Sequence, residues 1–319
     1  MATQSLLNDS AFRCAEELIS RATELGADVH KLPCGGRLVD AGVEAGGSVE
    51  AGIELARLCL ADRGHIEARP ETESPWQTAV VTVGTIEPIA GCLASQYAGW
   101  RISVGDYFAM GSGPMRAAYG KEDLFEHIGF TESPNVTVGV LESDALPTSD
   151  VFQYVSEKTG VPVPEIVLAV APTNSLAGGV QVVARSVETA LHKLHALEFD
   201  LTRIVDGRGT APLPPVAKKS LEALGRTNDS MLYGAQVTLR VRGDDASLEE
   251  MGPRVPSSSS SDHGIPFGKI FARYDYDFYK IDPHLFSPAE VRFVNLDTGS
   301  ELTFGQVEPS VLAKSFLGS

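Results

Sequence analysis

Short apolar runs alternate with segments of helical spacing along most of this chain, and this alternation limits the folds it can adopt. The runs at 136–141 and 166–170 have the length and composition of buried strands. Between them, residues 149–159 place apolar side chains at helical spacing, with Ser149 positioned to cap the helix start. Strands that alternate with helices are typical of α/β layers, so we expect an α/β fold of mixed α+β layers.

The same patterns predict the other main elements and a division of the chain. We expect helices at 10–25, 48–61, 86–100 and 309–317, strands at 37–40, 78–83 and 236–241, and a hairpin over 290–304. The proline-rich turn at 161–164 favours a domain boundary nearby, giving an N-terminal α/β domain over 1–160 and a C-terminal one over 161–319. The polar stretch at 243–264 contains five consecutive serines, which predicts a flexible surface loop, with a loop that covers a substrate as the alternative.

Composition narrows the possible partners. With 26 basic and 42 acidic residues the chain carries a formal net charge of −16, so phosphate backbones and anionic membranes are unfavourable partners. No apolar run is long enough to span a bilayer, and the first residues lack the features of a secretory signal, so we expect a cytoplasmic protein. The four cysteines form no C-x-x-C pair, which favours reduced, mostly buried thiols.

Several catalytic motifs are missing from the sequence. It contains no G-x-x-x-x-G-K-[ST] loop, no complete G-x-G-x-x-G fingerprint, no H-E-x-x-H, no zinc-deaminase signature and no G-x-S-x-G. The familiar sequence signatures for activating water with zinc or forming an acyl-serine are therefore absent. We expect any hydrolysis to use a substrate that is already electrophilic and an ordinary side-chain base.

The most informative segment follows the apolar run at 166–170 and is predicted as one helix over 174–194. Arg185, Glu188, His192 and His195 form one polar stripe along it, at spacings of three, four and three. One interpretation is a solvated surface stripe, in which an Arg–Glu pair contributes only ~0.2–0.5 kcal/mol. The other is a carboxylate at the edge of a pocket, held and tuned by the guanidinium. We leave both histidines out of the site.

These residues belong to a longer set of motifs that closely resembles the methenyltetrahydromethanopterin cyclohydrolase family. The resemblance runs in order over almost the whole chain, through the segments 37–43, 99–100, 107–114, 171–175, 183–193, 225–229, 232–234, 266–267, 274–282 and 285–288. His263 is a departure, because we expect tyrosine there. That leaves any role of this loop residue in doubt and does not affect the central helix.

The family resemblance implies both a reaction and an architecture. It implies reversible hydrolysis of 5,10-methenyltetrahydromethanopterin to 5-formyltetrahydromethanopterin, within formaldehyde oxidation in bacteria or carbon-dioxide reduction in methanogens. Glu188 would be the acid–base group and Arg185 its partner. The resemblance also implies two α/β domains with a substrate cleft between them, in a cytoplasmic homotrimer. No metal or prosthetic group is expected, because the pterin carrier is itself the substrate.

Other residues are weaker candidates for contacts with the substrate. They share a polar side chain or a backbone N–H in or beside one of these motifs, and they are Ser112, Gly113, Asn174, Ser175, Thr227, Asn228 and Lys269. Each also has a purely structural interpretation, such as a tight turn at 112–113 or helix capping at 174–175 and 227–228. Trp100, Phe108 and Tyr279 are predicted to be core residues.

Two other functions remain open from the sequence. The same chemistry could act on a folate carrier, although the usual folate enzyme depends on a dehydrogenase-like nucleotide domain that we do not find here. A non-catalytic reduced-pterin-binding protein is the alternative from another class. Arg185 and Glu188 count against it, because binding alone needs no proton shuttle.

Overall fold

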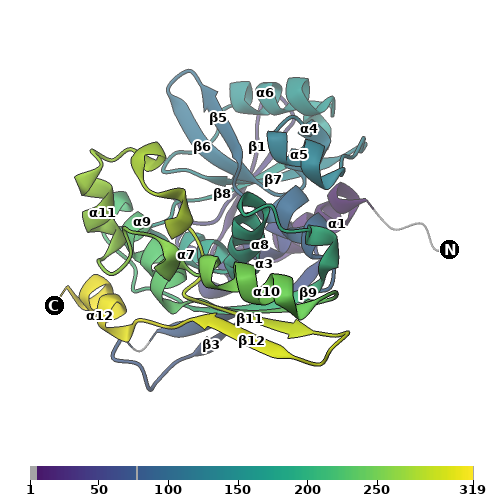
Figure 1. Cartoon of the computed structure of the whole chain (residues 1–319). Coiled ribbons are helices and arrows are strands. Elements are labelled where there is room, and N and C mark those ends of the chain that lie inside the picture. Colours follow the sequence, from purple (N-terminus) through teal and green to yellow (C-terminus); the bar gives the residue numbers. More distant parts are fainter. Residues whose placement is uncertain (1–5, 77, 319) are drawn as a thin grey trace. The chain divides into compact units, whose positions relative to one another are not determined.

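The computed structural model shown in Figure 1 describes residues 6–76 and 78–318. By their internal contacts these residues form two compact units. Unit 1 comprises the chain up to His65 together with Ile89–Val182, and unit 2 comprises Ile66–Pro88 together with Val183–Ser319. The predicted boundary near residue 160 falls inside unit 1.

Unit 1 is built on a six-stranded sheet. Its strands, in spatial order, are β1 Asp28–Lys31, β2 Arg37–Asp40, β8 Ile166–Ala171, β7 Thr137–Glu142, β6 Tyr107–Ser112 and β5 Trp100–Val104. Strand β8 runs parallel to β2 on one side and to β7 on the other, and the remaining pairs are antiparallel. This central place of β8 explains why the chain just after residue 160 belongs with the N-terminal strands.

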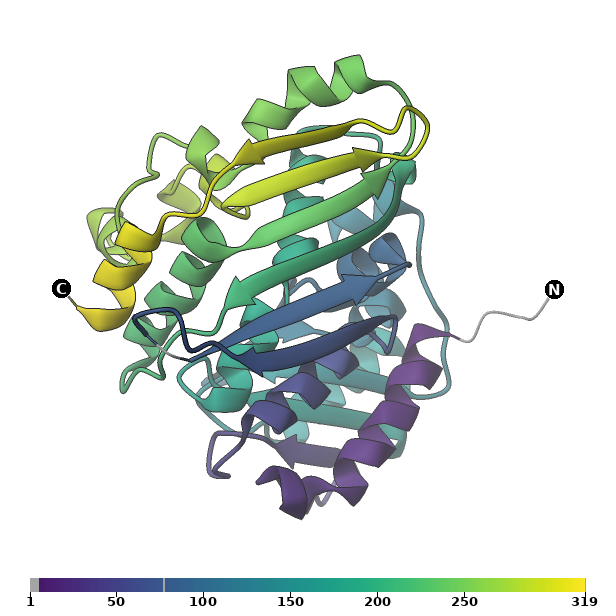
Figure 2. The same ribbon diagram turned by 90° about the horizontal axis from the view of Figure 1, so that it is seen from below.

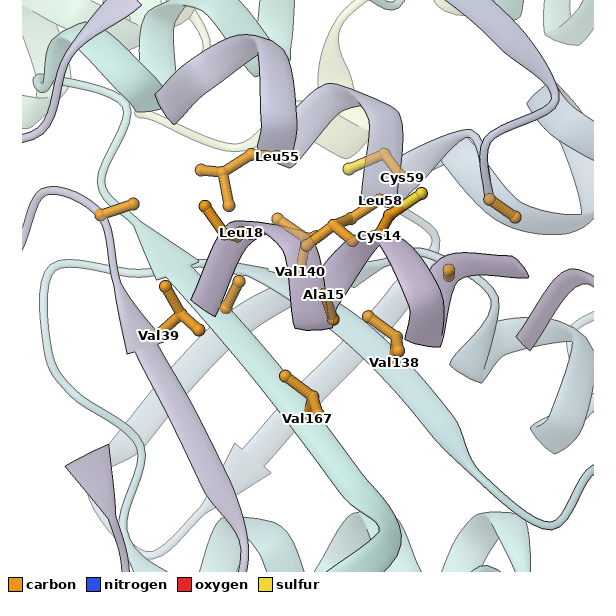
Figure 3. Packing of buried hydrophobic residues seen from close by; sticks show 14 of the residues in the cluster. Cys14, Ala15, Leu18, Val39, Leu55, Leu58, Cys59, Val138, Val140 and Val167 are labelled. Carbon is orange, nitrogen blue, oxygen red and sulfur yellow. The ribbon is translucent and has the colours of Figure 1, made fainter. Parts of the chain in front are cut away.

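The helices of unit 1 cover both faces of this sheet. They are α1 Leu7–Ser20, α2 Ala22–Leu25, α3 Val49–Cys59, α4 Met115–Tyr119, α5 Asp123–Ile128, α6 Ser149–Thr159, α7 Leu176–Val183, the π-helix Ile89–Gln96 and the 3₁₀ turn Val163–Glu165. Figure 3 shows Leu18 of α1 and Leu55 of α3 packed over Val138 and Val167. All four side chains are almost fully buried, and each contributes ~1.5–3 kcal/mol by leaving water.

Unit 2 holds a second six-stranded sheet. Its strands, in spatial order, are β12 Glu301–Gly305, β11 Glu290–Asn295, β10 Gln236–Val241, β9 Ile204–Pro212, β4 Ala79–Thr85 and β3 Gly64–Pro70. Figure 2 looks onto this sheet, with β11 and β12 in yellow at one edge and β3 in blue at the other. The pair β10–β11 is parallel, whereas β10–β9, β9–β4 and β11–β12 are antiparallel.

The helices of unit 2 include the one that carries the main candidate residues. They are α8 Ser186–Ala196, α9 Ser220–Asp229, α10 Asp245–Met251, α11 Phe267–Arg273, α12 Pro309–Leu317 and the π-helix Ser230–Gly234. Helix α8 packs against β9, β10 and β4, and α9 packs against α11 and α12. In the described residues no helix is both long and apolar enough to cross a membrane.

Much of the predicted pattern is confirmed, with local corrections. The bounds of β2, α6, β10 and α12 agree with the predictions, and β11 and β12 form the expected hairpin. Thr148, not Ser149, occupies the N-cap position of α6, and its side chain makes no capping hydrogen bond. The helix predicted over 86–100 is the shorter π-helix Ile89–Gln96.

The sequence suggested a loop over the serine-rich segment 243–264, but part of this segment is helical. Residues Asp245–Met251 form α10, which Asp244 caps by accepting a hydrogen bond from Ser247 N at 2.8 Å. Further on, Ser257 is buried and donates to Leu232 O at 2.5 Å, while Ser260 donates to Asp282 Oδ2 at 2.7 Å. Small polar side chains can be buried here because each of these hydroxyls finds a partner.

The predictions for three aromatic residues have different outcomes. Trp100 is buried in β5, as predicted. Phe108 is 50% exposed and Tyr279 is 92% exposed, so the prediction that they are core residues is wrong. Phe108 lies on the hairpin of β5 and β6 at the edge of the sheet, and Tyr279 lies in the 3₁₀ turn Phe278–Lys280. A hydrophobic side chain alone does not reveal which face of an edge element is covered.

Candidate active site

The chain around Arg185 and Glu188 is a junction between two helices, not the interior of one. Helix α7 ends at Val183 and α8 begins at Ser186, with Arg185 as its N-cap residue at φ −88° and ψ 11°. The prediction of one continuous helix is therefore wrong at 184–185. The consequence is chemical, because Glu188 lies in the first turn of α8, where free backbone N–H groups favour a negative charge.

Both members of the pair are buried. Arg185 is 8% exposed and Glu188 is 5% exposed, so the interpretation as a solvated surface stripe is wrong. Residues of one helix face, Val187, Leu191 and Leu194, are fully buried and hold α8 to the sheet. A glutamate and an arginine kept from bulk water at a helix start form the kind of pair that can tune a proton-transfer group.

The far end of α8 is anchored by a lysine that sequence reasoning missed. Lys193 is 2% exposed, and its Nζ donates to His284 O at 2.7 Å and to Ser259 Oγ at 3.3 Å, with His284 Nδ1 3.2 Å away. Burial lowers the pKa of Lys193 to about 8. This ammonium ties the serine-rich segment and the turn Pro283–Leu285 to the helix that carries Glu188.

Thr227, Asn228 and Lys269 lie on two helices that pack together, α9 and α11. Thr227 Oγ1 donates to Ala223 O at 3.1 Å, and Asn228 Nδ2 donates to Leu224 O at 2.9 Å. Both residues are inside the last turn of α9, so neither is a helix cap. Lys269 is exposed on α11.

The two helices approach closely where each has a glycine. A Cβ added to Gly225 would lie 3.5 Å from the backbone nitrogen of Gly268. Beside this crossing, Asp229 Oδ1 accepts a hydrogen bond from Phe267 N, the first residue of α11, at 2.7 Å. Asp229 is fully buried, and burial raises its pKa to about 7 against the opposing effect of its hydrogen bonds to Ser315 and Phe267.

In unit 1, Ser112 is the last residue of β6 and Gly113 follows it. Gly113 has φ +90°, a backbone conformation that favours glycine. Its N–H donates to Ser95 O at 2.8 Å, which commits this amide to the protein itself. Ser112 is buried, with its Oγ 3.2 Å from Cys59 Sγ. These contacts favour the structural interpretation of the turn.

Asn174 and Ser175 lie between β8 and α7. Ser175 caps α7, because its Oγ accepts from Gly178 N at 3.0 Å and donates to Pro172 O at 2.8 Å. The predicted cap is thus confirmed for Ser175. A Cβ on Gly178 would lie 1.9 Å from Pro172 O, so this glycine is required by a close backbone approach. Asn174 is half-buried in the same turn.

Comparison with known proteins places the chain in a family. A family model described as Cyclohydrolase (MCH) matches residues 6–316. A methenyltetrahydromethanopterin cyclohydrolase of Rhodopirellula baltica is 49% identical over 97% of this chain and 94% of its own length. Proteins of the same name from Xanthobacter autotrophicus and Methanosarcina barkeri are 44% and 40% identical, over 95% and 97% of this chain and 90% and 98% of their own lengths. The chain belongs to the methenyltetrahydromethanopterin cyclohydrolase family.

This membership confirms the resemblance found in the sequence and draws attention to Asp40, in the first of the family-like motifs. Its buried carboxylate accepts four backbone hydrogen bonds of 2.7–2.9 Å, from residues 42–45. Burial opposes ionisation of Asp40, but the four N–H groups together outweigh it and lower the pKa. Asp40 therefore fixes the loop after β2, where a Cβ on Gly42 would lie 2.5 Å from Ser175 Oγ.

Within residues 6–76 and 78–318, no group of three or more His, Cys, Asp or Glu side chains is arranged to hold a metal ion. Cys14, Cys59 and Cys92 are buried and Cys34 is half-buried. This agrees with the predicted mostly buried cysteines.

Proposed function

We propose that this chain catalyses the reversible hydrolysis of 5,10-methenyltetrahydromethanopterin to 5-formyltetrahydromethanopterin, a step of one-carbon metabolism that cleaves a cyclic amidine C–N bond. The observation that carries the proposal is the buried pair Arg185 and Glu188 at the start of α8, in a chain that matches this family over 6–316.

The substrate chemistry explains what such a pair can do. The methenyl carbon lies between two nitrogens that share one positive charge, so it is already electrophilic. Water adds to this carbon while Glu188 accepts one of its protons, giving a neutral tetrahedral carbinol. Glu188 then returns a proton to N10 as the C–N10 bond breaks, and the hydroxyl loses its proton to form the formyl carbonyl on N5. The net reaction releases one proton, because a cation becomes a neutral product.

Arg185 has a supporting role in this scheme. Arg185 is the N-cap residue of α8 and precedes Glu188 by three residues; a guanidinium near a carboxylate favours its ionised form, whereas burial favours the protonated form. A base that must accept a proton and then return it works best when these two influences are nearly balanced. Arg185 is therefore proposed to tune and orient Glu188.

The weaker candidates remain proposed substrate contacts, and the hydrogen bonds that they already make divide them into two groups. Lys269 is exposed and offers an ammonium, while Asn174 is half-buried in a turn. By contrast, four of the candidates already donate hydrogen bonds to backbone carbonyls. They are the hydroxyl of Thr227, the amide group of Asn228, the hydroxyl of Ser175 and the N–H of Gly113. Ser112 is fully buried. Lys269 and Asn174 are the first of the set to substitute.

We further propose that the enzyme works without a metal ion or prosthetic group, as a cytoplasmic homotrimer. The amidinium carbon needs no Lewis acid to become electrophilic, which supports the metal-free scheme. Activity is expected to survive exhaustive chelation, and a loss reversed by one divalent ion would contradict it. Light scattering tests the trimer, and a monomer mass at working concentration would reject it.

The deciding experiment is a comparison of two carriers. Purified protein is incubated with methenyltetrahydromethanopterin and, separately, with methenyltetrahydrofolate, and loss of the amidinium absorbance is followed. Turnover of the first only supports the proposal, and turnover mainly of the second would assign the chain to folate chemistry. Tight binding of the pterin without turnover would make it a reduced-pterin-binding protein.

A further inference from the structure

Strand β9 has two glycines on the face that meets α8. Gly207 and Gly209 are two residues apart, so they lie on the same face of the strand. The strand is inside the sheet, since Gly209 pairs with Val83 of β4 on one side and Val237 of β10 on the other. Glycine weakens an inner strand because it has no side chain to pack. The presence of two glycines within three residues of β9 therefore requires an explanation.

The reason lies in the space above them. A Cβ on Gly209 would lie 2.3 Å from Ser186 Oγ and 3.0 Å from Ser186 Cβ, and a Cβ on Gly207 would lie 2.7 Å from Val187 Cγ1. Neither glycine has a positive φ, so the backbone conformation suits any residue. What requires glycine at 209 is the closeness of the helix.

The residues that occupy this space belong to the first turn of α8. Ser186 and Val187 are fully buried and lie between Arg185 and Glu188 in the chain. The hydroxyl of Ser186 finds no hydrogen-bond partner among the described residues, and this side chain occupies the space that a Cβ on Gly209 would need. The distance between the first turn of α8 and β9 therefore depends on the absence of side chains at 207 and 209.

We propose that Gly207 and Gly209 form a glycine track on which the first turn of α8 rests, and that Gly209 is a positioning residue for Glu188. This inference rests on the proposed function, because it concerns where the acid–base group is held. A side chain at 209 moves the turn away from the sheet, and the carboxylate of Glu188 moves with it.

The test begins with Gly209→Ala and a matched glycine. Misplacing a catalytic group by 1 Å can cost 10²-fold in rate, so a shift of a few tenths of an ångström is expected to lower kcat by about tenfold. KM is expected to stay within about twofold, since the change is not at a substrate contact. The control is Gly84→Ala on β4, where the nearest atom to an added Cβ is Gly207 O at 3.9 Å, and wild-type kcat is expected.

A second substitution on the helix side distinguishes positioning from general destabilisation. Ser186→Gly in the Gly209→Ala background removes the two atoms nearest to the new methyl group and leaves Val187 Cγ2, at 3.3 Å, as the next, so kcat is expected to return to within about threefold of wild type. Ser186→Ala in that background removes only the hydroxyl and is expected to restore part of the loss. If kcat recovers more with Ser186→Gly than with Ser186→Ala, the original loss came from the contact with Ser186. A general loss of folded protein would not give this order.

The outcomes separate the track from the proposed function. If Glu188→Gln retains turnover, the catalytic assignment fails, whatever the glycines do. If Glu188→Gln is inactive while folded Gly209→Ala keeps wild-type kcat, or Ser186→Gly restores nothing, only the track is overturned. Should Gly209→Ala not fold, Ser186→Thr fills the same space from the helix with one methyl group. A kcat unchanged in that variant overturns the track equally.

Discussion

The carboxylate of Asp229 accepts a hydrogen bond from the backbone N–H of Phe267, and this bond joins the end of α9 to the start of α11. Asp229 follows Thr227 and Asn228 directly, and Lys269 lies two residues after Phe267. A single buried carboxyl group thus fixes the two segments that carry three candidate substrate contacts.

The pH dependence of stability tests this group. Burial raises the pKa of Asp229 from 3.8 to about 7, so the folded state holds this proton more tightly than the unfolded state does. Its contribution to stability is therefore full below pH 3.8 and is lost as the pH rises through about 7. Asp229→Asn keeps an acceptor oxygen for Phe267 and cannot ionise. We expect the melting temperature to fall more for the wild type than for this variant when the pH is raised from 5 to 8. Parallel curves would show that Asp229 does not titrate in that range.

Replacement of Lys193 tests whether its buried ammonium anchors α8. Lys193→Met removes the donor that His284 O and Ser259 Oγ share, in a buried position. A hydrogen bond to a charged group contributes about 1.5–3 kcal/mol, so the free energy of unfolding is expected to fall by that order. Urea unfolding at pH 7 is the measurement. Lys269→Met, at an exposed position of α11, is the matched control, with an expected change within about 0.5 kcal/mol. Equal effects of the two substitutions would remove Lys193 as an anchor of α8.

The contribution of Asp40 to stability is expected to depend on pH in the opposite direction from that of Asp229. Its pKa is lowered, because four backbone N–H groups outweigh the effect of burial, so its stabilisation is present above pH 3.8 and is lost as the pH falls through the folded pKa. Asp40→Asn replaces one acceptor oxygen by an NH₂ group that faces two backbone donors. We expect a loss of about 1–3 kcal/mol at pH 7, measured by urea unfolding, and a smaller loss at pH 3. A difference that does not depend on pH would mean that the charge of Asp40 is unimportant.

The elements that could be predicted are those whose signal is local. Strand β8 is apolar at every position because Val167 and Ala169 pack into one core cluster while Leu168 and Val170 pack into the other. That composition alone indicates a strand buried on both faces. The bounds of α6 and α12 follow in the same way from helical spacing, and from proline at the start of α12.

What could not be predicted depends on contacts between distant parts of the chain. Nothing near Asp229 reveals that its partner is 38 residues further on. The break at 184–185 contains neither glycine nor proline, so helix-forming residues conceal it. The spacing of Arg185 and Glu188 singled out this pair, but burial, which the spacing cannot give, removed the surface interpretation. The glycines of β9 are visible in the sequence, yet their reason appears only once α8 lies above them.

Glu188→Gln is the sharpest test of the mechanism. The amide is nearly the same size as the carboxylate and retains hydrogen bonding, so α8 and its buried face are expected to keep their packing. It cannot accept or return a proton at neutral pH. A positioned acid–base group supplies ~10²–10⁴-fold in rate, and kcat is expected to fall by that factor while the methenyl pterin still binds. Arg185→Ala is also expected to reduce turnover, because it changes both the orientation and the proton affinity of Glu188.

The measurement is kcat for the purified wild type and the variant, with thermal melting and substrate binding as controls for fold and site. If Glu188 served only as half of an ion pair, its replacement would change stability and leave the chemical step intact. The two roles differ by orders of magnitude in kcat, so the result does not depend on a fine margin. A folded variant that binds substrate and keeps kcat within about threefold of wild type, far less than the loss of an acid–base group, would remove Glu188 from the mechanism.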